Sequence, residues 1–159
     1  MPELPEVETT RRGIAPHTEG MKVSGVTIRQ RQLRWPIPAR LGSIITGYKV
    51  RSVERRAKYL LLRFDHGTLI MHLGMSGSLR ILPPGTEPEK HDHFDLEFAR
   101  VCLRLRDPRR FGAVLWTRGD PAAHKLLKHL GPEPLSPEFN GEHLHRLAQK
   151  RRAPVKSFI

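Results

Sequence analysis

The spacing of apolar residues changes from helical to strand-like near residue 20. Val7 and Ile14 lie two helical turns apart, so they would share one face of a helix. Pro5 suits the first turn of a helix, and Gly20 is of the type that commonly follows the last turn. The pattern therefore predicts a helix over residues 5–19.

Beyond this helix, apolar and polar residues alternate with a period of two. Short segments rich in Gly, Pro, Asp and His separate the alternating stretches, as in FDHGT and LPPGTEPEKHD. Several strands this closely spaced are typical of an antiparallel sandwich or barrel. The predicted strands are residues 23–28, 48–54, 58–64, 68–73, 78–82, 93–98, 101–106 and 111–116.

The segment RVCLRLR indicates how one of these strands would face its surroundings. Alternation places Val101, Leu103 and Leu105 on one side and arginines on the other. Antiparallel sheets commonly pack one face on the core and leave the other in water. We therefore expect one buried face and one solvated, positively charged face.

The pattern becomes helical again after Trp116. Leu126, Leu127 and Leu130 would share one side of a helix over residues 121–131. A second short helix is predicted over residues 140–150.

Together these elements predict an α+β fold. Residues 1–118 would form an N-terminal helix plus an antiparallel β-sandwich, and residues 119–159 the beginning of a helical domain. Two short helices are too few to close such a domain. We therefore expect the sequence to be a truncated part of a longer protein.

The charge of the chain points to a polyanionic partner. Lys and Arg number 28 against 16 Asp and Glu, which gives a net charge of +12. Basic side chains that neutralise phosphates release condensed counterions, so nucleic acid is the leading partner. A membrane is less favoured, because no basic amphipathic helix and no apolar run of about 20 residues is present. A basic protein without such a partner is the plain alternative.

The single cysteine limits the chemistry further. Cys102 is interpreted as a buried strand residue. One cysteine allows neither an intrachain disulfide nor a cysteine-based zinc site. The N-terminus carries acids rather than a secretory signal, and a reducing cytoplasm is the expected compartment.

Two loops present apolar side chains in a polar setting. In HLGMSGSLR, Gly74 and Gly77 permit a tight loop with Met75 at its tip. In RDPRRFG, Arg109 and Phe111 are two residues apart on an extended segment, so they would point the same way. Proteins that distort duplex DNA insert apolar wedges and place arginine near phosphates. The alternative is that Met75 and Phe111 pack in the core while the arginine is solvated.

Two further segments contain titratable groups. Lys58 follows Arg55 and Arg56, and cationic neighbours of this kind lower the pKa of a lysine and suit it to acid–base chemistry. A solvated strand edge is the plainer interpretation. His91 and His93 have the spacing of a metal pair, but no third ligand is evident, so we expect a hydrogen-bonding or phosphate-binding role.

The opening MPELPEVETT provides a possible nucleophile. If Met1 is removed, Pro2 becomes a terminal secondary amine. An α-amino group has a pKa near 8, well below that of lysine, so more of it is unprotonated at neutral pH. Such an amine can attack an electrophilic sugar carbon, and Glu3 beside it can move protons.

The motifs PELPEVE, RRAKYLL, HLGMSGSLR, EKHDH, DPRRFG and LGPEPL occur in this order along the chain. Together they resemble the formamidopyrimidine-DNA glycosylase family of bacterial enzymes that remove oxidised purines from DNA. The match extends from residue 2 to about residue 156. The resemblance implies an N-terminal catalytic β-sandwich and a helical second domain.

The resemblance also implies roles at the chemical centre. Pro2 would attack C1′ of the damaged nucleotide and form a Schiff base. Glu3 would donate a proton during base release, with Glu6 supporting the site. Lys58 would help the β-elimination that breaks the strand.

Other matching positions would contact DNA. Met75, Arg109 and Phe111 would fill the gap left when the damaged nucleotide turns out of the duplex. His91, Arg109 and Arg151 would bind DNA, and Lys156 could add a contact.

The chain departs from the family pattern after residue 159. The family's helix–two-turn–helix element and four-cysteine zinc finger are absent, so no cofactor is expected in this chain. The expected partner is double-stranded DNA with oxidised purines or abasic sites. We expect the protein to be a monomer and not to associate with a membrane. The main hypothesis is a DNA glycosylase and abasic-site lyase that excises 8-oxoguanine and formamidopyrimidines. A catalytically incompetent DNA-binding fragment is the alternative, and an RNA-binding protein has only the charge in its favour.

Overall fold

The computed structural model describes residues 1–159 and begins with the predicted helix. Helix α1 spans Leu4–Thr18, one residue away from the predicted start and end. Val7 and Ile14 are buried on its inner face, as their spacing indicates. Gly20 follows the helix with a φ of +76°, a conformation that glycine adopts without steric cost.

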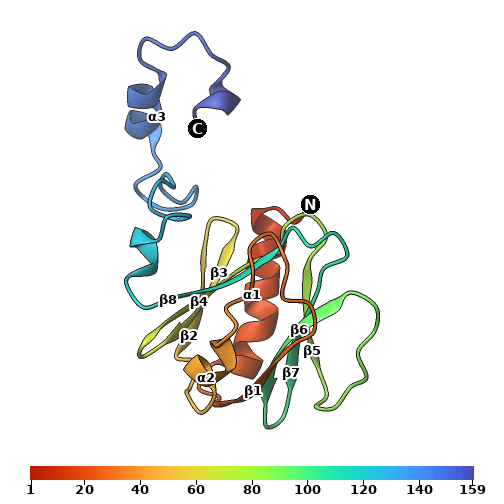
Figure 1. Ribbon diagram of the computed structural model, residues 1–159. Helices are drawn as coiled ribbons and strands as arrows, with labels where there is room; N and C mark the ends of the chain where they lie inside the picture. The colour runs from red at the N-terminus through yellow and green to blue at the C-terminus, as the bar shows by residue number, and fades with distance from the viewer.

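The body of the protein is a sandwich of two four-stranded antiparallel sheets (Figure 1). The first sheet has the order β1-β6-β7-β5 and the second the order β2-β3-β4-β8. Their strands are β1 (Val23–Ile28), β2 (Ser52–Arg56), β3 (Tyr59–Phe64), β4 (Gly67–His72), β5 (Ser78–Leu82), β6 (Asp92–Phe98), β7 (Cys102–Arg106) and β8 (Ala113–Thr117). The predicted sandwich is therefore confirmed.

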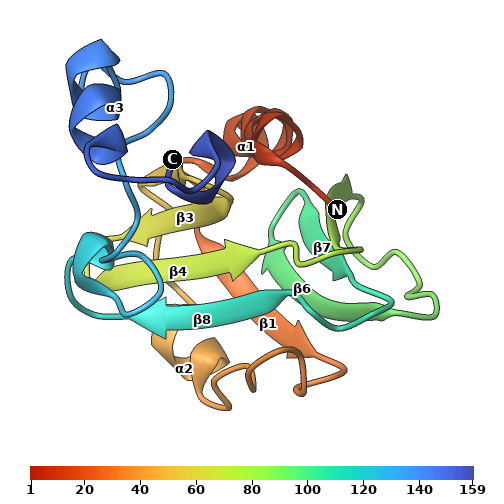
Figure 2. The same cartoon turned by 90° about the horizontal axis from the view of Figure 1, so that it is seen from above.

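Helix α1 runs along one side of the sandwich, where an edge strand of each sheet lies (Figure 2). It contacts β2 of one sheet and β5 of the other. One core cluster of 22 buried residues joins this helix to both sheets. A short helix that the sequence pattern did not indicate, α2 (Leu41–Ile45), packs against β1 with Leu41 and Ile45 buried.

The helix predicted over residues 121–131 is wrong. Only a 3-10 turn, η1 (Pro121–Ala123), forms there, and turns follow it. His124 leaves the helical conformation with a ψ of 142°, and its Nδ1 accepts the Leu126 N–H at 3.2 Å. This side-chain bond uses an amide that a helix would need, so a local turn replaces the helix.

The remainder of the chain has little buried surface. Helix α3 (Gly141–Ala148) is shorter than predicted and has no buried residue, and it lies apart from the sandwich in both views (Figures 1 and 2). The 3-10 turn η2 (Val155–Ser157) follows near the C-terminus. Leu127 is an exception, because it is buried against Leu61 and Ile70 of the second sheet. No helix is both long and apolar enough to cross a membrane.

The prediction that the arginine side chains of β7 face solvent is wrong for Arg104. This side chain is buried, and its Nε and Nη2 donate to the two carboxylate oxygens of Asp95 at 2.8 and 2.9 Å. Arg29 donates to the same carboxylate at 2.6 Å, and Arg104 also donates to the Thr86 carbonyl at 2.8 Å. An ion-pair network therefore buries Arg104 on the polar side of β7. Cys102 in the same strand is buried, as expected.

Replacing Asp95 by alanine is expected to destabilise the protein by about 3 kcal/mol, because the buried Arg104 would lose its directly hydrogen-bonded counter-ion and keep only Asp92 at 3.8 Å. Chemical denaturation monitored by tryptophan fluorescence measures this change. Asp65→Ala is the matched control, since the Arg51–Asp65 pair is exposed and such pairs contribute about 0–1 kcal/mol. Equal effects of the two substitutions would contradict a structural role for the buried pair.

The same pair has a defined pH dependence. Burial acts to raise the pKa of Asp95, but hydrogen bonds from Arg104 and Arg29 outweigh it and lower the pKa to about 2. A carboxyl with a lowered folded-state pKa stabilises the fold above its unfolded value of 3.8. That contribution is therefore expected to be lost as the pH falls from about 4 to about 2. Denaturation curves of wild type and Asp95→Asn should converge over this range.

Candidate active site

The N-terminus of α1 brings together the predicted catalytic residues. Pro2 directly precedes Glu3, which caps the helix. The Glu3 carboxylate lies 2.7 Å from Nζ of Lys58. The Glu3 backbone N–H donates to the Glu6 carboxylate at 3.0 Å, so Glu6 lies directly beside Glu3. An amine-bearing terminus, a carboxylate and a lysine therefore meet at one place.

Lys58 reaches this place from the tight turn between β2 and β3. Ala57 in that turn has a φ of 51°, which is rare for a residue with a side chain. Its N–H donates to Glu133 at 2.5 Å, and its carbonyl accepts from Arg55 at 3.0 Å. These bonds hold a strained turn that presents Lys58 to Glu3.

The neighbours of Lys58 differ from those expected. Lys58 pairs with the anion Glu3, whereas Arg55 and Arg56 both bond Glu133 from the segment after β8. The two arginines are thus neutralised by a separate carboxylate. Glu133 was not recognised from the sequence, because its partner turn lies more than 70 residues away and LGPEPL has the composition of a linker.

The electrostatics of the site favour an ionised Glu3. The hydrogen bond from Lys58 is the largest influence on the pKa of Glu3 and lowers it below its usual value of 4.5. The charges of the N-terminal amine and of Lys156 act in the same direction. At neutral pH, Glu3 is therefore a proton acceptor held by a cation.

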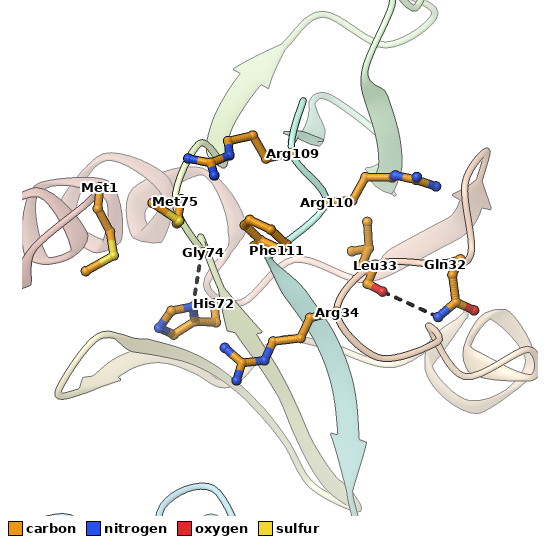
Figure 3. A pocket seen from close by; sticks show the side chains of 10 residues that line it. All are labelled: Met1, Gln32, Leu33, Arg34, His72, Gly74, Met75, Arg109, Arg110 and Phe111. Atoms are coloured by element: carbon orange, nitrogen blue, oxygen red, sulfur yellow. Dashed lines mark hydrogen bonds between the residues drawn. The ribbon is translucent and has the colours of Figure 1, made fainter.

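An open pocket of about 680 Å³ lies beside this pair (Figure 3). Side chains from four segments of the chain gather around it, with Met75, Arg109 and Phe111 above His72 and Arg34 in this view. The lining residues are Met1, Gln32, Leu33, Arg34, His72, Gly74, Met75, Arg109, Arg110 and Phe111.

The pocket rim contains the exposed apolar tips that the loop patterns indicated. Met75 and Phe111 remain 42% and 44% exposed, so neither side chain is packed in the core. The Arg109 guanidinium lies 5.1 Å from the centre of the Phe111 ring. The segment is a turn rather than the extended stretch that was expected, because Arg110 between them has a φ of 58° and donates its N–H to the Asp107 carbonyl. The structure thus brings Met75, Arg109 and Phe111 together.

His72 is a pocket residue that sequence reasoning missed, although it lies within the HLGMSGSLR motif. Its Nδ1 accepts the Gly74 N–H at 2.9 Å. Burial, and then the charges of Lys58 and Arg34, lower its pKa. The ring is therefore neutral near pH 7, with the remaining proton on Nε2 available to an acceptor.

Two expected DNA contacts lie outside the pocket lining. His91 has a φ of 74°, and its ring is 6.0 Å from that of His93. Arg151 follows α3 and stacks over Phe158 at 5.3 Å. No group of three or more His, Cys, Asp or Glu side chains is arranged to hold a metal ion.

Comparison with known proteins decides the family. Residues 1–114 match the family model described as the formamidopyrimidine-DNA glycosylase N-terminal domain. The chain belongs to the formamidopyrimidine-DNA glycosylase family. The expectation from the six motifs is thereby confirmed.

Two curated relatives named formamidopyrimidine-DNA glycosylase illustrate the extent of the match. The relative from Methylococcus capsulatus is 62% identical over 160 residues, which cover 100% of this chain and 59% of that protein. The relative from Alkalilimnicola ehrlichii is 58% identical over 166 residues, which cover 100% of this chain and 60% of that protein. The chain thus spans about three fifths of the length of these relatives.

Solved structures of the family have the same fold. The Lactococcus lactis glycosylase bound non-covalently to DNA with an abasic site superimposes with a TM-score of 0.84 at 31% identity, covering 91% of this chain and 56% of that one. MutM in complex with DNA that contains carbocyclic 8-oxoguanine gives a TM-score of 0.83 at 32% identity. The match covers 91% of this chain and 56% of that chain.

Removing the positive charge at residue 58 is expected to raise the pKa of Glu3 toward its usual value, because the Lys58 hydrogen bond is the main cause of the lowering. Titration of the Glu3 carboxyl carbon by NMR in Lys58→Gln measures the change. Lys156→Gln is the control and should have a smaller effect, since Lys156 acts only through its charge. A larger shift in Lys156→Gln would contradict the assigned pairing.

Proposed function

We propose that this chain carries the catalytic centre of a DNA glycosylase with abasic-site lyase activity that acts on 8-oxoguanine and formamidopyrimidines. The observation that carries the proposal is the meeting of the Pro2 end of the chain with the Glu3–Lys58 pair at 2.7 Å. Membership of the family and the relatives' names support the choice of reaction. The substrates are those implied by the DNA complexes of the solved relatives.

In this proposal the terminal amine of Pro2 is the nucleophile once Met1 has been removed. The amine nitrogen forms a bond to C1′ of the damaged nucleotide, and the bond from C1′ to the purine breaks. The amine loses its proton to the ionised Glu3, which returns that proton to the departing base. The ring oxygen takes a second proton from solvent as the sugar ring opens. The resulting iminium links the protein to the sugar.

Strand cleavage follows from the electronics of this iminium. Conjugation makes the protons on C2′ acidic, so removal of one of them expels the phosphate on C3′. Lys58 is held by Glu3, the residue next to Pro2, and can bind that phosphate or move the proton. A second elimination then releases the sugar and leaves the 5′ phosphate.

The rim of the pocket would support the displaced nucleotide. Turning a nucleotide out of the duplex costs a few kcal/mol in stacking and pairing. Insertion of Met75 and Phe111 into the gap replaces part of that contact, while Arg109 supplies a charge and hydrogen-bond donors. His91 and Arg151 would add contacts to the DNA backbone, together with Lys156.

The domain division and the setting are part of the same proposal. Residues 1–118 would be the catalytic sandwich, and residues 119–159 the beginning of a helical DNA-binding domain. The zinc finger of the family would not lie within these 159 residues, whose single cysteine is buried in β7. In this proposal the protein acts as a monomer on chromosomal DNA in a bacterial cytoplasm.

A non-catalytic DNA-binding fragment is the second candidate. Its specific support is that the chain spans only about three fifths of its relatives and that α3 buries no residue. Such a fragment would bind duplex DNA with a steep salt dependence and without preference for lesions.

Borohydride trapping tests the first proposal. The chain without Met1 is expected to form a covalent adduct with a duplex that carries 8-oxoguanine opposite cytosine, and with a duplex that carries an abasic site. The adduct should disappear when Met1 is retained or when a tag precedes Pro2, since the amine is then blocked. Denaturing gels measure the adduct, and mass spectrometry verifies the N-terminus.

The two duplexes separate the outcomes. An adduct with the abasic duplex alone would assign the lyase chemistry to this chain and lesion recognition to sequence beyond it. No adduct on either duplex would favour the binding fragment. An adduct that persists with a blocked terminus would exclude Pro2 as the nucleophile.

Phe111→Ala is expected to weaken binding to a duplex with an abasic site by about tenfold, because stacking of an aromatic ring on a base contributes about 1–3 kcal/mol. Titration monitored by fluorescence anisotropy measures the affinity, and the slope against salt should be unchanged because no phosphate contact is lost. An equal loss of affinity for undamaged duplex would argue against gap filling.

A further inference from the structure

Asp107 is a fully buried carboxylate at the end of β7, just behind the rim of the pocket. It opens the DPRRFG motif, but neither the resemblance nor the proposed reaction gives it a role. A polar group with no exposed surface is costly unless hydrogen bonds satisfy it, so its hydrogen-bond partners are informative.

The partners of Asp107 belong to two different loops. Its Oδ1 accepts the Ser76 hydroxyl at 3.0 Å, and its Oδ2 accepts the Gly112 N–H at 2.8 Å. Ser76 Oγ in turn accepts the Arg109 N–H at 3.1 Å. A continuous chain of bonds thus runs from Ser76, the residue after Met75, to Arg109 and Gly112 in the second loop.

The backbone of the two loops also meets directly. Gly74 has a φ of +61°, and a Cβ on it would collide with the backbone of Phe111. A Cβ on Gly112 would crowd the Asp107 carboxylate and the His72 carbonyl. The loops therefore have little freedom to move past each other while the bonds are intact.

The backbone of Asp107 extends the connection to a third segment. Its carbonyl accepts from His93 Nε2 at 3.0 Å, and its N–H donates to the His91 carbonyl at 3.0 Å. Three of the segments to which we assign DNA contacts, those of Met75, Arg109 and His91, are therefore bonded to this one residue.

We propose that Asp107 and Ser76 are positioning residues that hold Met75, Arg109 and Phe111 at fixed relative positions, so that the three side chains enter the DNA gap as one unit. We name these two residues the Asp107–Ser76 bridge. The inference rests on the proposed function and deepens it. Its physical reason is that a wedge fills a gap well only when it is preorganised, since ordering flexible side chains on binding lowers affinity.

A purely structural role is the competing explanation. In that case the bridge would stabilise the fold, and its loss would affect every activity alike. Ser76→Ala separates the two, because it removes the hydroxyl between the loops and leaves Asp107 bonded to Gly112. Ser78→Ala is the matched control, as Ser78 is exposed at the start of β5 and takes no part in the bridge.

The first measurement compares the affinity of the 159-residue chain for two probes. These are a duplex with a tetrahydrofuran abasic analogue and a single strand of the same sequence, which has no gap to fill. Ser76→Ala should bind the duplex about tenfold more weakly and the single strand equally well. Met75→Ala combined with Ser76→Ala should lose less affinity than the two single losses combined, because part of the effect of the bridge acts through Met75.

Three results would overturn the inference. One is an equal loss of affinity for both probes, which indicates a structural role. Another is full additivity of the two substitutions. The third is an unchanged affinity for both probes, which would show that the bridge has no role in DNA binding.

Hydrogen exchange provides a readout that does not depend on DNA. Ser76→Ala should speed exchange of the Arg109 amide roughly tenfold as well as exchange within residues 74–78, whereas Ser78→Ala should affect neither loop beyond its own position. If the chain binds neither probe, the proposed function fails, and hydrogen exchange alone tests whether the bridge couples the two loops. Faster exchange in both loops then supports the coupling, and a change confined to residues 74–78 overturns it.

Discussion

The arrangement of the site depends on the packing of α1 against the edges of both sheets. Val7 and Ile14 are almost completely buried in the common core, and each such side chain contributes about 1.5–3 kcal/mol. Because a helix is stiff, this burial fixes the direction in which its N-terminus points. The packing of α1 therefore positions Glu3 next to the β2–β3 turn.

A charged network extends this constraint from the helix to the turn. Arg55 in β2 bonds Glu8 of α1 at 3.1 Å and Glu133 at 2.8 Å. The pKa of Glu8 is lowered to about 2, chiefly by its hydrogen bond with Arg11, so the carboxylate remains charged over the physiological range. Arg55 thus joins the helix, the turn that presents Lys58 and the segment after β8, and the Lys58 turn is held in its strained form from two sides.

Backbone strain is concentrated where the chain would meet DNA. Ala57, His91 and Arg110 all have positive φ values without being glycine. Ala57 and Arg110 lie beside residues assigned a chemical or DNA-binding role, His91 is assigned one itself, and each is held by surrounding hydrogen bonds. Conformations of this kind persist only when neighbouring structure enforces them, which agrees with a site built before its ligand arrives.

The sequence allowed the strands and the chemical residues to be predicted, because alternation and residue type are local properties. It could not reveal Arg104 as buried, since the Asp95 that neutralises it lies on another strand. The predicted helix after Pro121 failed for a related reason, as a single side-chain bond from His124 outweighed the leucine spacing. Glu133 and Asp107 escaped notice because their importance lies in three-dimensional contacts with turns far away in the sequence.

The Glu3–Lys58 pair suggests how DNA binding and proton transfer are linked in the proposed reaction. Lys58 is the main influence that keeps the pKa of Glu3 low. A DNA phosphate that draws Lys58 toward itself weakens that hydrogen bond, and the pKa of Glu3 then rises. Glu3 thereby becomes a better acceptor for the proton of the attacking amine and, once protonated, can donate to the departing base. The resting ion pair would in this way delay the proton transfer until a strand occupies the pocket, because only a bound phosphate competes for the lysine.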